Sequence, residues 1–250
     1  MGKITDTVKV LLIINVIFYL GSIGLGENAY RLFALWFPKN DNFEIWQIIT
    51  HMFMHSQESF AHILFNMFML YMFGSHLEQS IGQSKFLFLY FSAGFGAMGL
   101  QLLFHYLNFQ PGYEAFVEAG FSNAEIMDFM RNGQYNTAVL EHISEEKISR
   151  MFGSYNSLMV GASGAISGVI AAFAVIYPNL PLYIMFIPIP IKAKYLIGFY
   201  FLLDLYGGIT GQSLLGPSNV AHWAHIGGAV IGFLTMWYWK KNSFHQNRWN

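Results

Sequence analysis

The 250-residue sequence contains no cysteine, and this absence excludes several classes of protein at once. Disulfide-stabilised domains, zinc–thiolate sites, iron–sulfur clusters and cysteine nucleophiles all need the thiol group. Charge is also scarce: Asp, Glu, Lys and Arg make up 11% of the chain, whereas a soluble domain carries roughly 25%. The formal net charge is −1 and there is no run of basic residues. Because nucleic-acid binding needs a clustered cationic surface, the sequence predicts no nucleic-acid partner.

Apolar and aromatic residues take the place of charge. Hydrophobic residues make up 54% of the chain and aromatic residues 18%, and the mean hydropathy is +0.40. The 24 glycines fit this composition, because glycine is more frequent in membrane helices than in soluble ones. No cleavable secretory signal precedes the first apolar stretch, so residues 1–9 are expected to be the polar head of a membrane helix. The composition predicts an integral membrane protein in contact with lipids.

The apolar stretches predict an all-α bundle of six transmembrane helices that forms a single membrane domain over residues 1–250. A bilayer core is about 30 Å thick and takes around 20 apolar helical residues to cross. The six expected spans are roughly Val8–Leu25, Phe60–Leu77, Phe86–Leu107, Val160–Tyr177, Tyr195–Ile209 and His222–Trp239. An extended outer loop, about 108–158, separates the third helix from the fourth. A capping-box sequence at Ser122 and a second amphipathic pattern predict two short helices over the outer face.

The basic residues predict the orientation, because Lys and Arg are enriched in short cytoplasmic loops. One side of the bundle carries Lys3, Lys9, Lys85, Lys192, Lys194, Lys240, Lys241 and Arg248. The other side has basic residues only within two long, acidic loops. We therefore expect both termini in the cytoplasm and a location in the inner (plasma) membrane of a bacterium.

Three groups of polar residues lie where membrane helices should be apolar, and such residues are functional candidates. His62 and Asn66 are four residues apart and share one face of the second span. The fourth span begins with GASG at 161–164 and the sixth with HWAH at 222–225. His62, Ser163 and His225 each lie 14 residues before the inner end of their helix, about 21 Å along its axis. In a core of about 30 Å, all three are expected about 9 Å below the outer surface.

Small residues indicate which of these helices touch. Small-x-x-x-small faces, which let membrane helices approach closely, occur on the fourth and sixth spans at Gly164 and Gly168 and at Gly228 and Gly232. Such a contact would bring Ser163 within reach of His225, whose imidazole would accept the proton of the hydroxyl nucleophile. His62 and Asn66 would add donors where an oxyanion develops. Together these groups predict a serine hydrolase site below the membrane surface.

These motifs resemble those of the rhomboid intramembrane serine proteases. The resemblance runs through WQIITHMFMH at 46–55, HILFN at 62–66, GSHLE at 74–78, GASG at 161–164 and AHIGG at 224–228. It covers most of the chain from about Trp46 to Gly232, except the long outer loop. A single G-x-S-G is weak evidence, because Gly and Ser are common in membrane helices. G-x-S-G, H-x-x-x-N and A-H-x-x-G in this order on these spans are much more specific.

The resemblance implies a Ser–His dyad, with Ser163 as nucleophile and His225 as general base. It also implies an oxyanion hole formed by His62, Asn66 and the backbone N–H of Ser163, and it implies neither a metal nor a cofactor. The implied substrates are single-span membrane proteins, cut within or near their transmembrane segment. The alternative is a catalytically silent rhomboid-like protein that binds membrane clients for quality control. Such proteins typically lack the serine or the histidine, and this chain has both.

Two features depart from the family pattern. The segment between His55 and His62 is longer than usual. In addition, Ser167 stands four residues after the nucleophile, where many members have an aromatic residue that packs on the catalytic histidine. His225 must therefore be oriented by another group.

Five further polar residues are expected to be structural. Asp204 in the fifth span is expected to form a structural hydrogen bond, since a dyad does not need it. His222 competes with His225 as a candidate base but lies one turn nearer the surface, where interfacial packing is expected. His51 and His55 are expected to cap backbone groups in the outer loop, because without a nearby carboxylate or cysteine they do not form a metal-ligand pattern. Glu78 is expected to anchor a turn at the inner end of the second span.

The orientation is testable by cysteine labelling, since the chain has no cysteine of its own. A cysteine introduced at Ser144, in the outer loop, should react with an impermeant maleimide in intact cells. A cysteine at Ser243, near the C-terminus, should react only after lysis. The reverse pattern would invert the orientation and place the candidate site near the cytoplasm.

Overall fold

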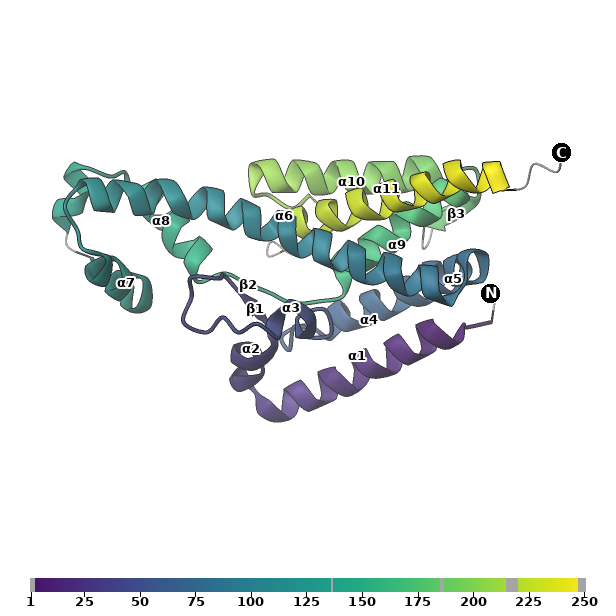
Figure 1. The fold of residues 1–250 in the computed structure, drawn as a ribbon, viewed down its shortest axis with the longest axis horizontal. Helices are drawn as coiled ribbons and strands as arrows, with labels where there is room; N and C mark the ends of the chain where they lie inside the picture. The colour runs from purple at the N-terminus through teal and green to yellow at the C-terminus, as the bar shows by residue number, and fades with distance from the viewer. Residues whose placement is uncertain (1–2, 136, 185–186, 215–219, 247–250) are drawn as a thin grey trace.

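The computed structural model describes residues 3–135, 137–184, 187–214 and 220–246 and is mostly helical (Figure 1). Its helices are α1 (Asp6–Leu25), α2 (Glu27–Phe33), α3 (Gln47–Thr50), α4 (Phe60–Met69), α5 (Ser75–Ile81), α6 (Gln83–Glu118), α7 (Asn123–Asn132), α8 (Glu145–Tyr155), α9 (Ser163–Ile176), α10 (Ala193–Thr210) and α11 (His222–Gln246). A π-helical turn, η1 (Leu70–Gly74), joins α4 to α5, and η2 (Thr137–Glu141) is a 3₁₀ turn. The two chain ends lie at the same end of the bundle (Figure 1).

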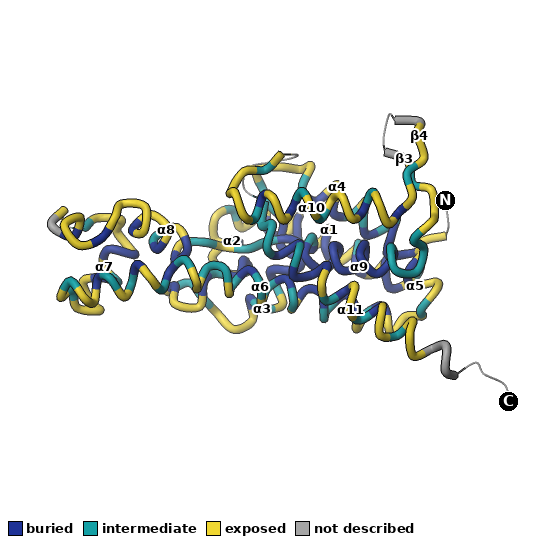
Figure 2. Tube along the Cα trace, turned by 90° about the horizontal axis from the view of Figure 1, so that it is seen from above, coloured by how far each residue is buried: buried dark blue, intermediate teal, exposed yellow. Residues whose placement is uncertain are grey.

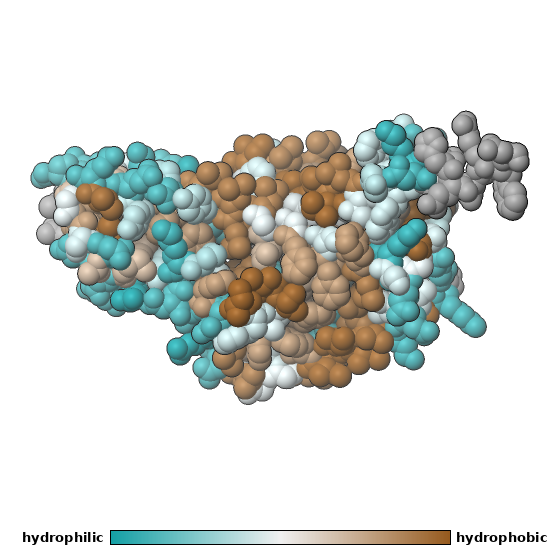
Figure 3. Space-filling model, in the orientation of Figure 1, coloured by the Kyte–Doolittle hydropathy of each residue, from teal (hydrophilic) through white to brown (hydrophobic). Residues whose placement is uncertain are grey.

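Within the described residues, three helices have the length and composition needed to cross a bilayer: α1, the continuous helix Phe60–Ile81 that α4, η1 and α5 form, and α6. They contain the first three expected spans. The shorter α9, and α10 and α11, occupy the places of the other three, and the six crossings stay a prediction. Figure 3 shows apolar surface across the middle of the molecule and hydrophilic surface towards both ends, the distribution expected of a bundle in a bilayer.

The structure also contains two small antiparallel sheets that the all-α expectation did not include. Strand β1 (Leu35–Trp36) pairs with β2 (Leu158–Met159) just before α9. Strands β3 (Pro181–Ile184) and β4 (Ile187–Lys192) form a hairpin between α9 and α10, with Leu182 opposite Ile191. Alternating prolines in β4 remove backbone N–H donors that a helix needs, which explains the extended conformation of this strand.

Helix α6 continues well past the expected third span and supports a separate lobe. Its 36 residues extend about 54 Å at 1.5 Å per residue, far more than a bilayer core of about 30 Å. The far end of α6 packs with α7 and α8 around a second apolar core that includes Phe109, Phe116, Ile126 and Met151. The two short helices and the Ser122 capping box are confirmed. They do not lie flat over the bundle, however, but follow α6 outward from the end opposite the termini (Figure 1).

Glu78 anchors the N-terminus of α1 to α5. Its buried carboxylate accepts hydrogen bonds from the Thr5 hydroxyl and from the backbone N–H groups of Thr7 and Val8, the latter two at 3.4 and 3.2 Å. Because the first N–H groups of a helix have no intrahelical acceptor, this side chain completes the start of α1. The predicted anchoring role of Glu78 is confirmed, although its partner is the first helix and not a turn.

Helix α9 lies at the centre of the bundle, and every residue from Gly164 to Phe173 is buried (Figure 2). Its two glycines face those of α11 so closely that the backbones touch. A methyl group on Gly228 would lie 1.9 Å from the Gly164 carbonyl oxygen, and one on Gly232 would lie 2.1 Å from that of Gly168. The predicted close contact between the fourth and sixth spans is therefore confirmed.

Replacing Gly228 with Ala should force α9 and α11 apart, because the new methyl has no space beside the Gly164 carbonyl. Overpacking of this kind typically costs about 1–3 kcal/mol, so the melting temperature in detergent should fall clearly. Gly99→Ala in α6 is the matched control: its methyl meets no atom within 4 Å, and alanine favours a helix by about 1 kcal/mol over glycine. Equal melting temperatures for the two variants would contradict the packing described.

Candidate active site

Ser163 is the first residue of α9, and the chain reaches it through a glycine with a positive φ. Gly161 has a φ of +114°, in the region that side-chain-bearing residues rarely adopt. Its N–H donates to the His51 carbonyl at 2.9 Å, which ties the entry to α9 to the segment before α4. Since the first N–H groups of a helix lack an intrahelical acceptor, the N–H of Ser163 is available to an incoming oxygen.

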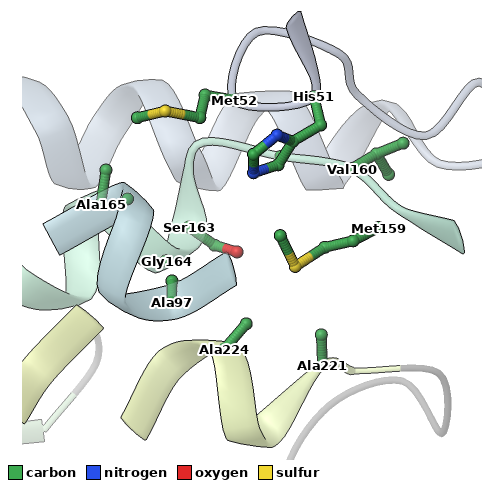
Figure 4. Close-up of a pocket in the computed structure, with 12 residues that line it drawn as sticks. His51, Met52, Ala97, Met159, Val160, Ser163, Gly164, Ala165, Ala221 and Ala224 are labelled. Atoms are coloured by element: carbon green, nitrogen blue, oxygen red, sulfur yellow. The ribbon is translucent and has the colours of Figure 1, made fainter. Parts of the chain in front are cut away.

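The Ser163 side chain points into a narrow cavity (Figure 4). His51 and Met159 line one side of the cavity, and Ala221 and Ala224 of α11 line the other. The cavity has room for about one water molecule. The nucleophile candidate therefore lies inside the bundle but beside a space that a water molecule can occupy.

His62, on the first turn of α4, lies directly against the Gly161 backbone. A Cβ on Gly161 would be 3.1 Å from His62 Nε2 and 3.7 Å from Ser163 Oγ, so both groups border the same small volume. On the other edge of the ring, the N–H of Ser56 donates to His62 Nδ1 at 3.2 Å. Because Nδ1 accepts, the neutral ring carries its proton on Nε2. The donor edge of His62 thus faces the start of α9.

Asn66 lies one turn further along α4 and is buried. Its Nδ2 donates to the His62 carbonyl at 2.8 Å, which uses one amide hydrogen and leaves the second for another acceptor. The structure places His62 and Asn66 on one face, as the spacing predicts. The part that Asn66 takes in any chemistry stays a prediction.

His225 is on the first turn of α11, next to the point where α11 contacts α9. The Ala224 carbonyl oxygen would be 3.6 Å from a methyl on Gly164, so the residues that follow Ala224 and precede Gly164 are neighbours in space. In the described part of the chain, the side-chain hydrogen bonds of His225 all use Nδ1, and none joins it to Ser163. Such bonds are often long or absent before substrate binds.

Two residues of α10, Asp204 and Tyr200, contact the imidazole of His225. Both carboxylate oxygens of Asp204 lie 3.2 Å from His225 Nδ1, and the Tyr200 hydroxyl lies 3.3 Å from it. The Tyr200 hydroxyl is also close to Ser167. The expected structural hydrogen bond of Asp204 is present, but its contact with His225 is not among the predictions. The sequence feature that could have indicated this contact is an ionisable residue within an apolar span.

His222 packs against α10, and its expected position near the membrane interface stays a prediction. Its side chain is 11% exposed, and its Nδ1 lies 2.7 Å from Asp204 Oδ1. The ring lies over Gly207 of α10, where a methyl group would be 2.5 Å from Nε2. The close approach is possible because glycine occupies this position.

His51 and His55 hold the segment before α4 in place. The ring N–H of His51 donates to the Gln47 carbonyl at 2.7 Å, a backbone cap as predicted, and burial lowers the pKa of His51 to about 4. His55 Nε2 pairs instead with the Asn15 side chain of α1 at 2.9 Å, so the prediction of a backbone cap is wrong there. Burial lowers the pKa of His55 to about 3. Among the described residues, no three His, Asp or Glu side chains are grouped to hold a metal ion.

The sequence matches one known family over most of its length. A family described as the Rhomboid domain matches residues 42–131 and 134–242. The chain belongs to the rhomboid family. It is an integral membrane protein, as the family and its apolar helices indicate.

A curated relative is the rhomboid protease GlpG of Salmonella choleraesuis (strain SC-B67), which is 31% identical over 77 residues. This match covers 30% of the present chain and 27% of the relative, so the chain spans about a quarter of that protein's length. The rhomboid-domain match is far longer and includes His62, Asn66, Ser163, Asp204 and His225.

Proposed function

We propose that this rhomboid is an intramembrane serine protease that cleaves single-span membrane proteins within or near their transmembrane segment. The observation that carries the proposal is the junction of three helix starts: Ser163 at the start of α9, His62 at the start of α4 and His225 at the start of α11. His62 and Ser163 border the same small volume beside Gly161, and His225 follows Ala224, whose carbonyl lies next to Gly164. These contacts support a shared site for a hydroxyl, an N–H donor edge and an imidazole. Ser163 itself lines the cavity, His225 directly follows Ala224, which also lines it, and His62 lies against the lining residue Gly161.

The proposed nucleophile is Ser163 and the proposed base is His225. As the Ser163 oxygen bonds to the scissile carbonyl carbon, its proton passes to His225 Nε2. His225 then gives this proton to the leaving amine as the C–N bond breaks, which leaves an acyl-enzyme. A water molecule repeats the sequence, with His225 taking its proton, and releases the acid product with Ser163 restored.

The proposed oxyanion hole uses three donors. The backbone N–H of Ser163 has no intrahelical acceptor, and the Nε2–H of His62 faces the same point. Asn66 contributes its second amide hydrogen. Fixed donors of this kind stabilise the negative charge that develops on the carbonyl oxygen, and a water-excluding site strengthens them.

The proposed setting is a six-helix bundle with cytoplasmic termini in a bacterial inner membrane. The positions of the termini and of the lobe support it, because the termini share one end of the bundle and the lobe extends from the other end (Figure 1). With this orientation, Ser163 lies in the outer half of the bilayer. A substrate helix would reach the site laterally, from the lipid.

Ser163→Ala and His225→Ala should each lower the cleavage of a model single-span substrate in proteoliposomes by at least about 10³-fold. The double variant should be no worse than either single one, because residues that serve one step are not additive. Ser75→Ala, which changes another buried membrane serine, and His222→Ala should keep clear activity. Substantial turnover by Ser163→Ala would contradict the dyad and favour a client-binding protein with a contaminating protease.

His62→Ala and Asn66→Ala should lower turnover severely without preventing insertion or folding. Loss of one oxyanion donor typically costs about 10²–10³ in rate, and the loss should fall on kcat. Asn108→Ala in α6 is the matched control, because Asn108 makes the same side-chain bond to the carbonyl four residues earlier. If both site variants turn over substrate at the wild-type rate, the oxyanion is stabilised elsewhere.

A further inference from the structure

Asp204 is a buried carboxylate that the proposed dyad does not use. Its side chain is 5% exposed, on a helix whose other faces carry exposed apolar residues such as Leu202 and Ile209. An isolated carboxylate inside a membrane bundle is costly and is kept only where partners compensate for the lost hydration. The partners of Asp204 include two histidines of α11, His222 and His225, and the Tyr200 hydroxyl of its own helix.

The two histidines approach the carboxylate differently. His222 Nδ1 lies 2.7 Å from Oδ1 alone, whereas His225 Nδ1 lies 3.2 Å from both oxygens. An ionised carboxylate only accepts hydrogen bonds, so His225 must carry its proton on Nδ1 to make these contacts. Its Nε2 then has a free lone pair, and this is the nitrogen that a base needs.

We propose that Asp204 is a positioning residue for His225, which extends the dyad to an Asp204–His225–Ser163 triad. Asp204 holds the imidazole in the Nδ1–H tautomer and fixes the plane of the ring. When the Ser163 proton moves to Nε2, the fixed carboxylate stabilises the imidazolium that forms, and no proton passes to Asp204 itself. This inference rests on the proposed function, because it assigns a partner to the proposed base.

The surroundings of Asp204 support a positioning role. His222 is locked against Gly207 and holds Oδ1 by the shorter bond, so the carboxylate is fixed independently of His225. Tyr200 lies beside the imidazole, with ring centroids 6.4 Å apart and an angle of 31° between the planes. The small Ser167 side chain leaves room for this tyrosine. Asp204 and Tyr200 of α10 therefore orient His225, a role that an aromatic residue on α9 has in many rhomboids.

The test compares Asp204→Asn with His222→Asn in proteoliposomes. Asp204→Asn keeps the shape but replaces one acceptor oxygen with a donor, which favours the wrong tautomer of His225. The corresponding change in a Ser-His-Asp protease lowers kcat about 10⁴-fold, and we expect a loss of 10²–10⁴-fold in kcat with KM within about twofold of wild type. His222→Asn keeps a donor toward Asp204 and leaves the contact between Asp204 and His225, so its loss in kcat should be at least about tenfold smaller than that of Asp204→Asn. Melting temperatures are measured for both variants.

Two results would overturn the triad: an Asp204→Asn kcat within about threefold of wild type, or equal activity losses in both variants with equal falls in melting temperature. If Asp204→Asn does not fold, Asp204→Glu decides the question. It restores a carboxylate and should retain measurable turnover that depends on Ser163, whereas an inactive Asp204→Glu with a wild-type melting temperature would reject the role. An active Ser163→Ala protein would instead reject the proposed function itself, and thus separates the two failures.

Discussion

The contact between the glycine faces of α9 and α11 is the constraint on which the rest of the structure depends. Without side chains at Gly164, Gly168, Gly228 and Gly232, the two backbones touch, and dispersion and close packing replace the hydrophobic effect that lipid does not supply. The contact sets the distance between the two helix starts, and those starts carry Ser163 and His225. Helix α6 closes the same junction from a third side, where a methyl on Gly168 would be 2.2 Å from Ala93 Cβ.

In the proposed membrane setting, the short length of α9 gives this junction its depth below the outer surface. Fourteen residues span about 21 Å, so a helix that ends at one membrane surface must begin below the other. The chain enters it as the extended strand β2, through Gly161. The start of a helix has free N–H groups. A helix start that lies beneath the membrane surface therefore has these donors where water is scarce. In the proposed mechanism, the same feature provides both the position of the nucleophile and a means of stabilising an oxyanion.

Much of this was predictable from the sequence, because membrane proteins show their spans and their misplaced polar residues directly. The helix positions, the glycine contact and the His62–Asn66 face followed from periodicity and residue size. The reach of α6 beyond the bilayer, the β3–β4 hairpin and the partners of Asp204 did not follow. An ionisable residue in a span indicates that a partner exists, but only the packing of α10 on α11 shows that Asp204 meets both His222 and His225. A capping box likewise locates a helix start but not the direction in which the helix lies.

The most direct test of the account is the site of reaction with a fluorophosphonate probe in native membranes, mapped by mass spectrometry of the peptides. A serine becomes reactive toward this probe only when a base and an oxyanion hole act on it together. The account predicts one adduct, on the peptide that contains Ser163, and no adduct in the His225→Ala protein. An adduct on another serine, or an unmodified Ser163 under conditions that label a known serine hydrolase, would contradict it.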